Sequence, residues 1–177
     1  MQKNIGNVYV DLDGVIAGCD EGTAIFNNVS LEEFRRLGWN NPYWDNMVKN
    51  ANAKDFFSNL PWEENGVRLL RWFKENNISY TFLTRPLREP NTAKCIEGKK
   101  IWLKKHNLKM PVIFEFDKEK YAISEDGKQN ILIDDHSGNI EKWIAAGGIG
   151  IHYRWYDCDK VLNRLDSLLE PIVERRI

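Results

Sequence analysis

Five short apolar runs along the chain have the length and composition of buried β-strands. They cover residues 7–10, 79–83, 112–116, 131–133 and 149–153. Short runs bounded by polar and turn-forming residues are typical of strands covered on both faces. The pattern therefore predicts five strands inside a mostly parallel sheet.

Segments with helical periodicity separate these strands from residue 62 onward. The residues predicted to share a helix face are Val67, Leu70 and Phe73 in 63–76, Ile96, Lys100 and Leu103 in 93–106, and Ile140 and Ile144 in 138–146. Alternating strands and helices predict an α/β protein with helices on both faces of the sheet and right-handed crossovers. Residues 161–173 form a further amphipathic pattern, with Pro171 expected to kink or end the helix.

The interval 18–61 breaks this alternation and predicts a helical insertion after the first strand. Ser30 is a helix N-cap candidate, with Glu33 in the capping-box position. The aromatic residues in and next to the interval are Phe26, Phe34, Trp39, Tyr43, Trp44, Phe56, Phe57 and Trp62. They either pack the insertion as a lid onto the body or form a platform for a ligand.

Composition agrees with one domain carrying a modest insertion. The chain has 177 residues, 42% of them hydrophobic, and a formal net charge of −1. Near neutrality argues against a surface that coats nucleic acid, although it leaves room for a small phosphate-binding pocket. Cys19, Cys95 and Cys158 lack metal-ligand spacing and are expected to be reduced packing residues. With no apolar run long enough for a signal peptide or a membrane span, a cytoplasmic protein is expected.

Two carboxylates follow the first strand in the sequence Asp11-Leu12-Asp13-Gly14. Burying two carboxylates is costly unless a cation or hydrogen-bond donors compensate their charge, and open α/β sheets bind ligands at the carboxyl ends of their strands. The pair is therefore a candidate site for a divalent cation. The alternative is an ordinary Asp-Gly turn.

Three further segments place polar side chains after predicted strands. Thr84 can donate its hydroxyl to a phosphate, or it can be an ordinary helix cap. A lysine at 118 or 120 can neutralise a phosphoryl group and an attacking carboxylate, and the pattern does not separate Lys118 from Lys120. Asp134 and Asp135 follow three aliphatic residues and supply a metal ligand from a second strand, in a set of oxygens that suits Mg²⁺.

With these motifs in this order, the chain resembles the haloacid dehalogenase-like (HAD) phosphatase superfamily over its whole length. Residues 83–86 and 131–153 look most like the 5′(3′)-deoxyribonucleotidase group and its phage and bacterial relatives. The resemblance implies a Rossmann-like, three-layer core from residues 1–17 and 62–177, and a small helical cap of the C1 type from residues 18–61.

The resemblance also implies a role for each motif residue. Asp11 would be the nucleophile that forms an aspartyl-phosphate, and Asp13 the general acid and base. Mg²⁺ would be held by Asp11, Asp134 and the backbone carbonyl of Asp13. Asp135 would either orient the metal's ligands or bind the metal through water. Thr84 and Lys118 would hold the phosphoryl oxygens.

The substrate implied is a small phosphomonoester, most readily a nucleoside monophosphate, because cap aromatics such as Trp44 could stack on a nucleobase. Arg85 could add a phosphate or sugar contact, or form a surface salt bridge instead. The alternatives are a phosphatase of another metabolite or of nucleic-acid 3′-phosphate ends, a phosphotransferase, and a non-catalytic binding protein. Neither a membrane nor a nucleic acid is expected as a partner.

Overall fold

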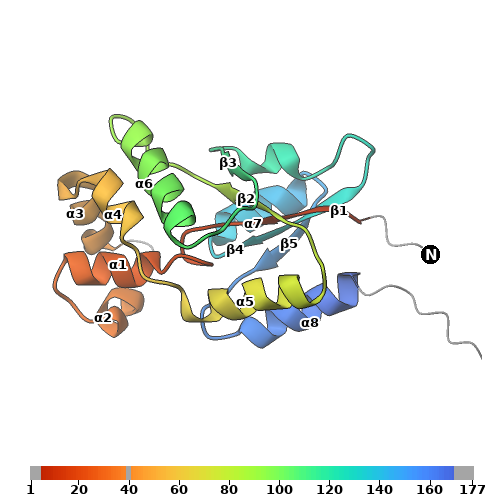
Figure 1. Ribbon diagram of the computed structural model, residues 1–177, viewed down its shortest axis with the longest axis horizontal. Coiled ribbons are helices and arrows are strands. Elements are labelled where there is room, and N and C mark those ends of the chain that lie inside the picture. Colours follow the sequence, from red (N-terminus) through yellow and green to blue (C-terminus); the bar gives the residue numbers. More distant parts are fainter. Residues whose placement is uncertain (1–4, 39–40, 170–177) are drawn as a thin grey trace, which may run out of the picture.

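Five parallel strands form one sheet in the order β3-β2-β1-β4-β5 (Figure 1). The computed structural model describes residues 5–38 and 41–169. The strands are β1 Ile5–Val10, β2 Thr81–Thr84, β3 Val112–Phe114, β4 Gln129–Asp134 and β5 Ile149–His152. All five predicted strands and the α/β fold class are confirmed.

Strand order reverses direction at β1, and this reversal decides where the helices lie. The chain runs outward from β1 to β2 and β3, returns to β4 on the other side of β1, and continues to β5. Because such crossovers are right-handed, helices on the two sides of β1 must cover opposite faces. Accordingly, α5 (Glu64–Glu75), α6 (Thr92–Lys105) and α8 (Cys158–Leu169) pack on one face, and α7 (Ser137–Ala145) packs on the other. The fold is the expected three-layer, Rossmann-like arrangement.

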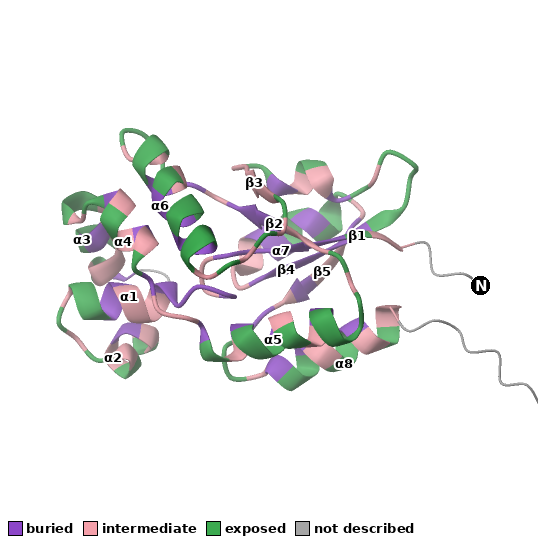
Figure 2. Ribbon diagram, in the orientation of Figure 1, coloured by how far each residue is buried: buried purple, intermediate pink, exposed green. Residues whose placement is uncertain are grey.

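The central strand β1 contributes to two separate cores. Val8 and Val10 point to the face covered by α5, α6 and α8, while Tyr9 points to α7 and packs edge-on against Trp143 at 5.7 Å between ring centroids. Figure 2 shows this burial concentrated along the strands. Since each fully buried apolar side chain contributes about 1.5–3 kcal/mol, β1 is firmly fixed, and so is the loop that follows it.

The predicted helix faces were wrong in part. Val67 and Ile144 are 38% and 54% exposed, and Lys100 is exposed as well. The buried positions are Gly66, Leu69 and Phe73 in α5, Cys95, Gly98, Lys99, Trp102 and Leu103 in α6, and Asn139, Ile140 and Trp143 in α7. These faces centre on glycines that allow close approach and on polar residues with buried partners, which a search for apolar spacing overlooks.

In the described part of the interval between β1 and α5, residues 11–38 and 41–63, four helices are present, and we call them the cap. They are α1 Cys19–Phe26, α2 Leu31–Arg36, α3 Pro42–Asn50 and α4 Ala53–Ser58. Figure 1 shows them grouped beyond the carboxyl ends of the strands. The capping interaction is confirmed, since the Ser30 hydroxyl accepts a hydrogen bond from the Glu33 N–H at 3.0 Å. The domain boundaries placed at residues 18 and 61 remain a prediction.

Several cap aromatics serve packing. Phe56 packs edge-to-face against Phe26 and Phe57, at 6.4 and 5.1 Å between centroids, and Phe34 and Phe57 are buried. Trp39 lies outside the described residues, as do Pro171 and the end of the predicted final helix. The described part of that helix, α8, begins at Cys158 and packs through Val161 and Leu165.

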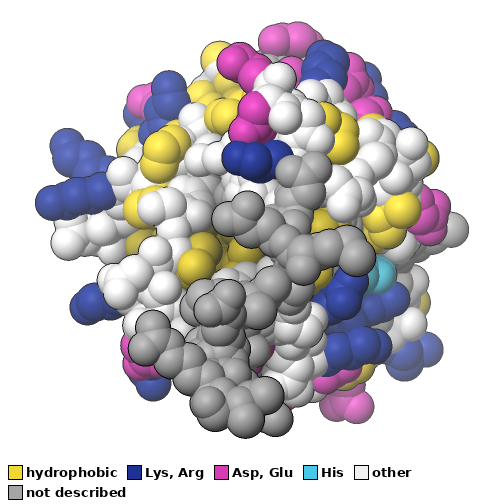
Figure 3. Space-filling model, turned by 90° about the vertical axis from the view of Figure 1, so that its right-hand side faces the viewer, with side chains coloured by type: hydrophobic (Ala, Val, Ile, Leu, Met, Phe, Trp, Pro, Cys, Tyr) yellow, Lys and Arg dark blue, Asp and Glu magenta, His cyan; other side chains and the backbone are white. Residues whose placement is uncertain are grey.

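The cysteines lie in the interior, as expected for packing residues. Cys19, Cys95 and Cys158 are buried and free. Within residues 5–38 and 41–169, no helix combines the length and the apolar character needed to cross a membrane. On the face shown in Figure 3, acidic and basic side chains are interspersed, with one group of Lys and Arg side chains beside a histidine.

Gly98 provides a test of how the cap packs on the core. A Cβ at this position would lie 2.5 Å from the Lys54 carbonyl oxygen and 3.0 Å from Phe57 Cβ, both in α4. Alanine normally stabilises a helix interior by about 1 kcal/mol relative to glycine. We expect Gly98→Ala instead to lower the free energy of unfolding by about 1–3 kcal/mol, measured by urea denaturation. Lys100→Ala in the same helix should change it little, and a stabilised Gly98→Ala variant would contradict the close packing of α4 on α6.

Candidate active site

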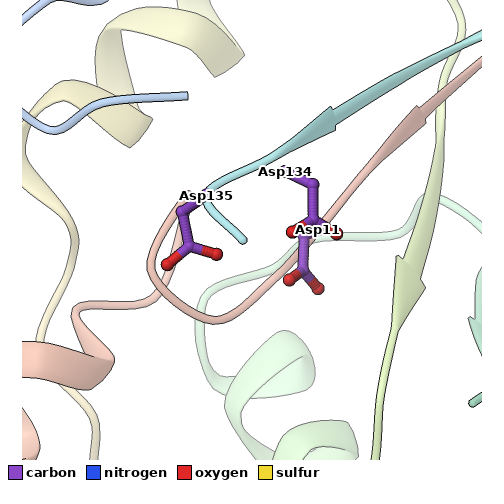
Figure 4. Close-up of side chains that lie close together, drawn as sticks. All are labelled: Asp11, Asp134 and Asp135. Atoms are coloured by element: carbon purple, nitrogen blue, oxygen red, sulfur yellow. The ribbon is translucent and has the colours of Figure 1, made fainter. Parts of the chain in front are cut away.

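Asp11 and Asp134 lie side by side because their strands are neighbours at the point where strand order reverses. Val10 is in register with Ile133, and the Asp11 N–H donates to the Ile133 carbonyl at 2.9 Å. One carboxylate oxygen from each of Asp11, Asp134 and Asp135 lies within 4.8 Å of the other two (Figure 4). Crevices at such reversals are where open α/β sheets bind ligands.

Asp134 is fully buried and held in one orientation. One of its oxygens accepts from the His136 N–H at 2.8 Å, and the Asn139 side-chain amide donates to both oxygens at 3.1 and 3.0 Å. Lys118 donates to Oδ2 at 2.6 Å. Asn139 was not identified from the sequence, because a single Asn in the first turn of a helix has many ordinary explanations.

Burial is the largest effect on the carboxylates of Asp11 and Asp135, and repulsion from neighbouring carboxylates adds to it. Burial raises the pKa of Asp11 to about 6; Lys118 opposes this effect, and the neighbouring charges of Asp134 and Asp13 add to it. Burial, with the charges of Asp134 and Asp11, also raises the pKa of Asp135 well above its usual range. A divalent cation among these oxygens would relieve the repulsion, and a donor set made only of carboxylates suits Mg²⁺.

The structure separates the two candidate lysines. Lys118, in the short 3-10 helix Lys118–Tyr121, is 1% exposed and lies 3.0 Å from Asp11 Oδ1 and 2.6 Å from Asp134 Oδ2. Lys120 has a side chain 58% exposed and pairs with Asp117 and Glu115. Lys118, and not Lys120, therefore contacts the carboxylates of both Asp11 and Asp134.

A second buried lysine, Lys99, escaped the sequence analysis. Its ammonium lies 2.6 Å from Asp13 Oδ2, donates to the Thr84 hydroxyl at 2.8 Å and also donates to the Arg85 carbonyl. Burial lowers the pKa of Lys99, but the nearby carboxylates of Asp13 and Asp11 outweigh it, so the pKa is raised and the ammonium keeps its proton. The burial of Lys99 could have been predicted from its neighbours, because Gly98 and Trp102 lie on the same buried side of α6.

Asp13 has one engaged oxygen and one that is not engaged. Oδ2 is held by Lys99, whereas Oδ1 is buried with no hydrogen-bond partner among the described residues. A buried carboxylate oxygen without a donor is costly, so this atom marks a place where a ligand or water would bind.

Gly14 makes room for Asp135. Its φ is +72°, and a Cβ there would overlap the Asp135 carboxylate. Both the backbone conformation and the close approach therefore require glycine.

Arg85 and Trp44, the two other predicted substrate contacts, contact other parts of the protein in the structure. Arg85 Nε donates to the Phe116 carbonyl at 2.8 Å, which ties the loop after β2 to the loop that carries Lys118. Trp44 is partly buried and packs against the main hydrophobic core. Their roles as substrate contacts remain predictions.

Comparison with solved structures identifies the fold. A hydrolase from Streptococcus pneumoniae TIGR4 superposes with a TM-score of 0.53 at 15% sequence identity, covering 92% of this chain and 100% of that one. A HAD family hydrolase from Deinococcus radiodurans R1, with bound phosphate and sodium, superposes with a TM-score of 0.50 at 13% identity, covering 93% of this chain and 89% of that one. The chain has the HAD-hydrolase fold. No protein-family model and no curated protein matched the sequence.

The ion pair between buried Lys99 and partly buried Asp13 has a matched control on the surface. Lys54 and Glu97 are also 2.6 Å apart, but their side chains are 41% and 54% exposed. Removing one partner of a buried pair leaves an uncompensated charge, so we expect Lys99→Met to cost about 3–5 kcal/mol of unfolding free energy.

A double-mutant cycle by urea denaturation measures the difference between the two pairs. Asp13→Asn with Lys99→Met should show strong coupling, and Glu97→Gln with Lys54→Met little or none. Equal coupling energies in the two cycles would contradict the prediction that burial makes the Asp13–Lys99 ion pair stronger than the exposed one.

Proposed function

We propose that the protein is a Mg²⁺-dependent phosphomonoester hydrolase that acts through an aspartyl-phosphate on Asp11. The observation that carries this proposal is the meeting of Asp11 and Asp134 across neighbouring strands, with Lys118 bonded to both and Asp135 within 4.8 Å. The HAD-like fold supports it, as does the phosphate bound by the Deinococcus hydrolase.

Asp11 is suited to act as the nucleophile. Its Oδ1 is fixed by the Leu12 N–H at 2.7 Å and by Lys118 at 3.0 Å, which leaves Oδ2 to attack phosphorus. The attack forms a bond from Oδ2 to phosphorus and breaks the bond from phosphorus to the leaving oxygen. Water then attacks the same phosphorus and releases phosphate, restoring the Asp11 carboxylate.

Asp13 is suited to move the proton. Its unengaged Oδ1 would hold the proton that goes to the leaving oxygen and would later take one from the attacking water. Because Lys99 fixes Oδ2, Oδ1 keeps a constant position during both steps.

The positive charges offset the approach of a phosphate dianion to several carboxylates. Mg²⁺ would be held by Asp11, Asp134 and the backbone carbonyl of Asp13, with Asp135 alongside, and it would supply charge compensation when bound. Lys118 and the Thr84 hydroxyl would hold phosphoryl oxygens in a site partly closed to water, where such interactions are strongest.

Nucleoside monophosphates are the substrates we favour. The aromatic residues around the cap suit a flat leaving group, and the net charge of −1 is poorly suited to a polyanion. A panel that includes sugar phosphates and oligonucleotides with 3′-phosphate ends separates this substrate class from its alternatives.

Asp11→Asn tests the covalent mechanism. We expect Mg²⁺-dependent phosphate release from nucleoside monophosphates to fall more than about 10³-fold, because an amide cannot act as the nucleophile. Removing Mg²⁺ with a chelator should abolish activity of the unmodified protein. Asp126→Asn, at an exposed turn, is the control. If Asp11→Asn hydrolyses substrate as well as this control does, the aspartyl-phosphate step is excluded.

Lys118→Met and Lys120→Met form a matched pair two residues apart. We expect Lys118→Met to lower kcat/KM by about 10²–10³-fold through loss of charge compensation, and Lys120→Met to leave it within about twofold. Steady-state kinetics measure both, with circular dichroism to establish folding. Equal effects at the two positions would show that burial between Asp11 and Asp134 gives Lys118 no special role.

A further inference from the structure

A cavity of about 380 Å³ lies between the cap and the core, outside the group of catalytic carboxylates. Its cap wall comes from Glu21 of α1 and Arg35 of α2. Its core wall comes from the start of α5, including Glu63 and Glu64, and from Trp155 and Tyr156 in the loop after β5. This volume falls in the range of about 300–1,000 Å³ typical of small-molecule sites.

The cavity opens at the same edge of the sheet as Asp11 and Asp134. The Glu63 N–H donates to the Ile16 carbonyl at 2.9 Å, in the loop that carries Asp11 and Asp13. On the other side, the Tyr153 N–H donates to the Asp134 carbonyl at 2.9 Å, two residues before Trp155. Backbone hydrogen bonds therefore tie two lining segments directly to the strand tips that would bind phosphate.

The single guanidinium of the cavity is already engaged. Arg35 Nε lies 3.2 Å from Asp20, its Nη2 lies 3.4 Å from Glu63, and its Cζ lies 4.1 Å from the centre of the Trp155 ring. These contacts join Arg35 of the cap to Glu63 and Trp155 on the core wall of the cavity.

Two carboxylates of the cavity have no such partner. Among the described residues, no hydrogen bond or ion pair engages the side chain of Glu21 or Glu64, whereas Glu63 is buried beside Arg35. Free carboxylates accept hydrogen bonds from N–H donors and repel phosphates. The cavity is therefore unsuited to a second phosphate and suited to an amino group.

Flat aromatic surfaces complete the lining. Trp155 and Tyr156 are 44% and 64% exposed, with their ring centroids 5.2 Å apart, and Trp62 lines the cavity as well. Large exposed aromatic rings beside free carboxylates provide stacking surface and hydrogen-bond acceptors together.

We infer that this cavity binds the leaving group of the substrate and selects planar rings that carry an amino group, so that amino-bearing nucleoside monophosphates are preferred over their oxo counterparts. The inference rests on the proposed function and deepens it. It assigns the specificity contacts to Glu21, Glu64, Trp155 and Tyr156 rather than to Trp44. It also predicts that a second phosphate weakens binding.

The decisive comparison is dCMP with dUMP, which differ at C4, amino against carbonyl, and at N3, which carries a hydrogen in dUMP alone. A carboxylate that faces C4 meets an N–H donor only in dCMP. We expect kcat/KM to favour dCMP by about tenfold, as one hydrogen bond to a charged group would provide. In Glu64→Gln or Glu21→Gln this ratio should fall toward 1, and Trp155→Ala should raise KM for both nucleotides. Glu75→Gln, at the exposed far end of α5, is the matched control.

Three results would overturn the inference. They are equal kcat/KM for dCMP and dUMP, an unchanged ratio in both glutamate variants, and a raised KM in Trp44→Ala but not in Trp155→Ala. Acetyl phosphate, which is too small to fill the cavity, tests the proposed function separately, since a protein that hydrolyses neither it nor any nucleotide is not a phosphatase.

In that case, binding of unphosphorylated deoxycytidine and deoxyuridine, followed by NMR, still tests the cavity. Preference for deoxycytidine that disappears in Glu64→Gln supports the inference, and equal binding overturns it.

Discussion

Balance of buried charge is the constraint on which the rest of this structure depends. Asp11, Asp13 and Asp134 sit within a site that also buries two ammonium groups, Lys118 and Lys99. Each lysine is 1% exposed and would be costly alone, as would the carboxylates that it contacts. Together they remain stable because each charge has a partner, and the excess of negative charge that is left around Asp135 is what a divalent cation would neutralise.

The fold brings these charges together through the reversal of strand order. β1 and β4 are neighbours in the sheet although more than a hundred residues separate their ends. Their pairing brings Asp11 and Asp134 together, and Lys118 then contacts both carboxylates. Helices α6 and α7 and the short 3-10 helix then deliver Lys99, Asn139 and Lys118 from three directions. Rigid elements supply the charged groups, and the cap lies over the edge where they emerge.

Apolar runs were sufficient to predict the sheet, and acids at the ends of those runs were sufficient to predict where Asp11 and Asp134 lie. Both signals are local in sequence. Lys99 could not be predicted in the same way, because its burial depends on acceptors supplied by Asp13, Thr84 and Arg85 from other elements. The same limit applied to the cap, where aromatic composition predicted Trp44 as a ligand contact but did not indicate that Trp155 and Tyr156, about a hundred residues further on, line the cavity.

The contact between α4 and α6 would link the cap to the proton transfer proposed for Asp13. Gly98 lies against the backbone of α4, and the next residue, Lys99, lies 5.1 Å over the Phe57 ring of the same helix while it grips Asp13. A displacement of α4 would therefore move this turn of α6 and with it the Lys99 ammonium, which fixes the position of the Asp13 carboxylate. The position of the cap and the orientation of Asp13 would then change together. Opening the cap would misalign Asp13 and prevent the proposed reaction.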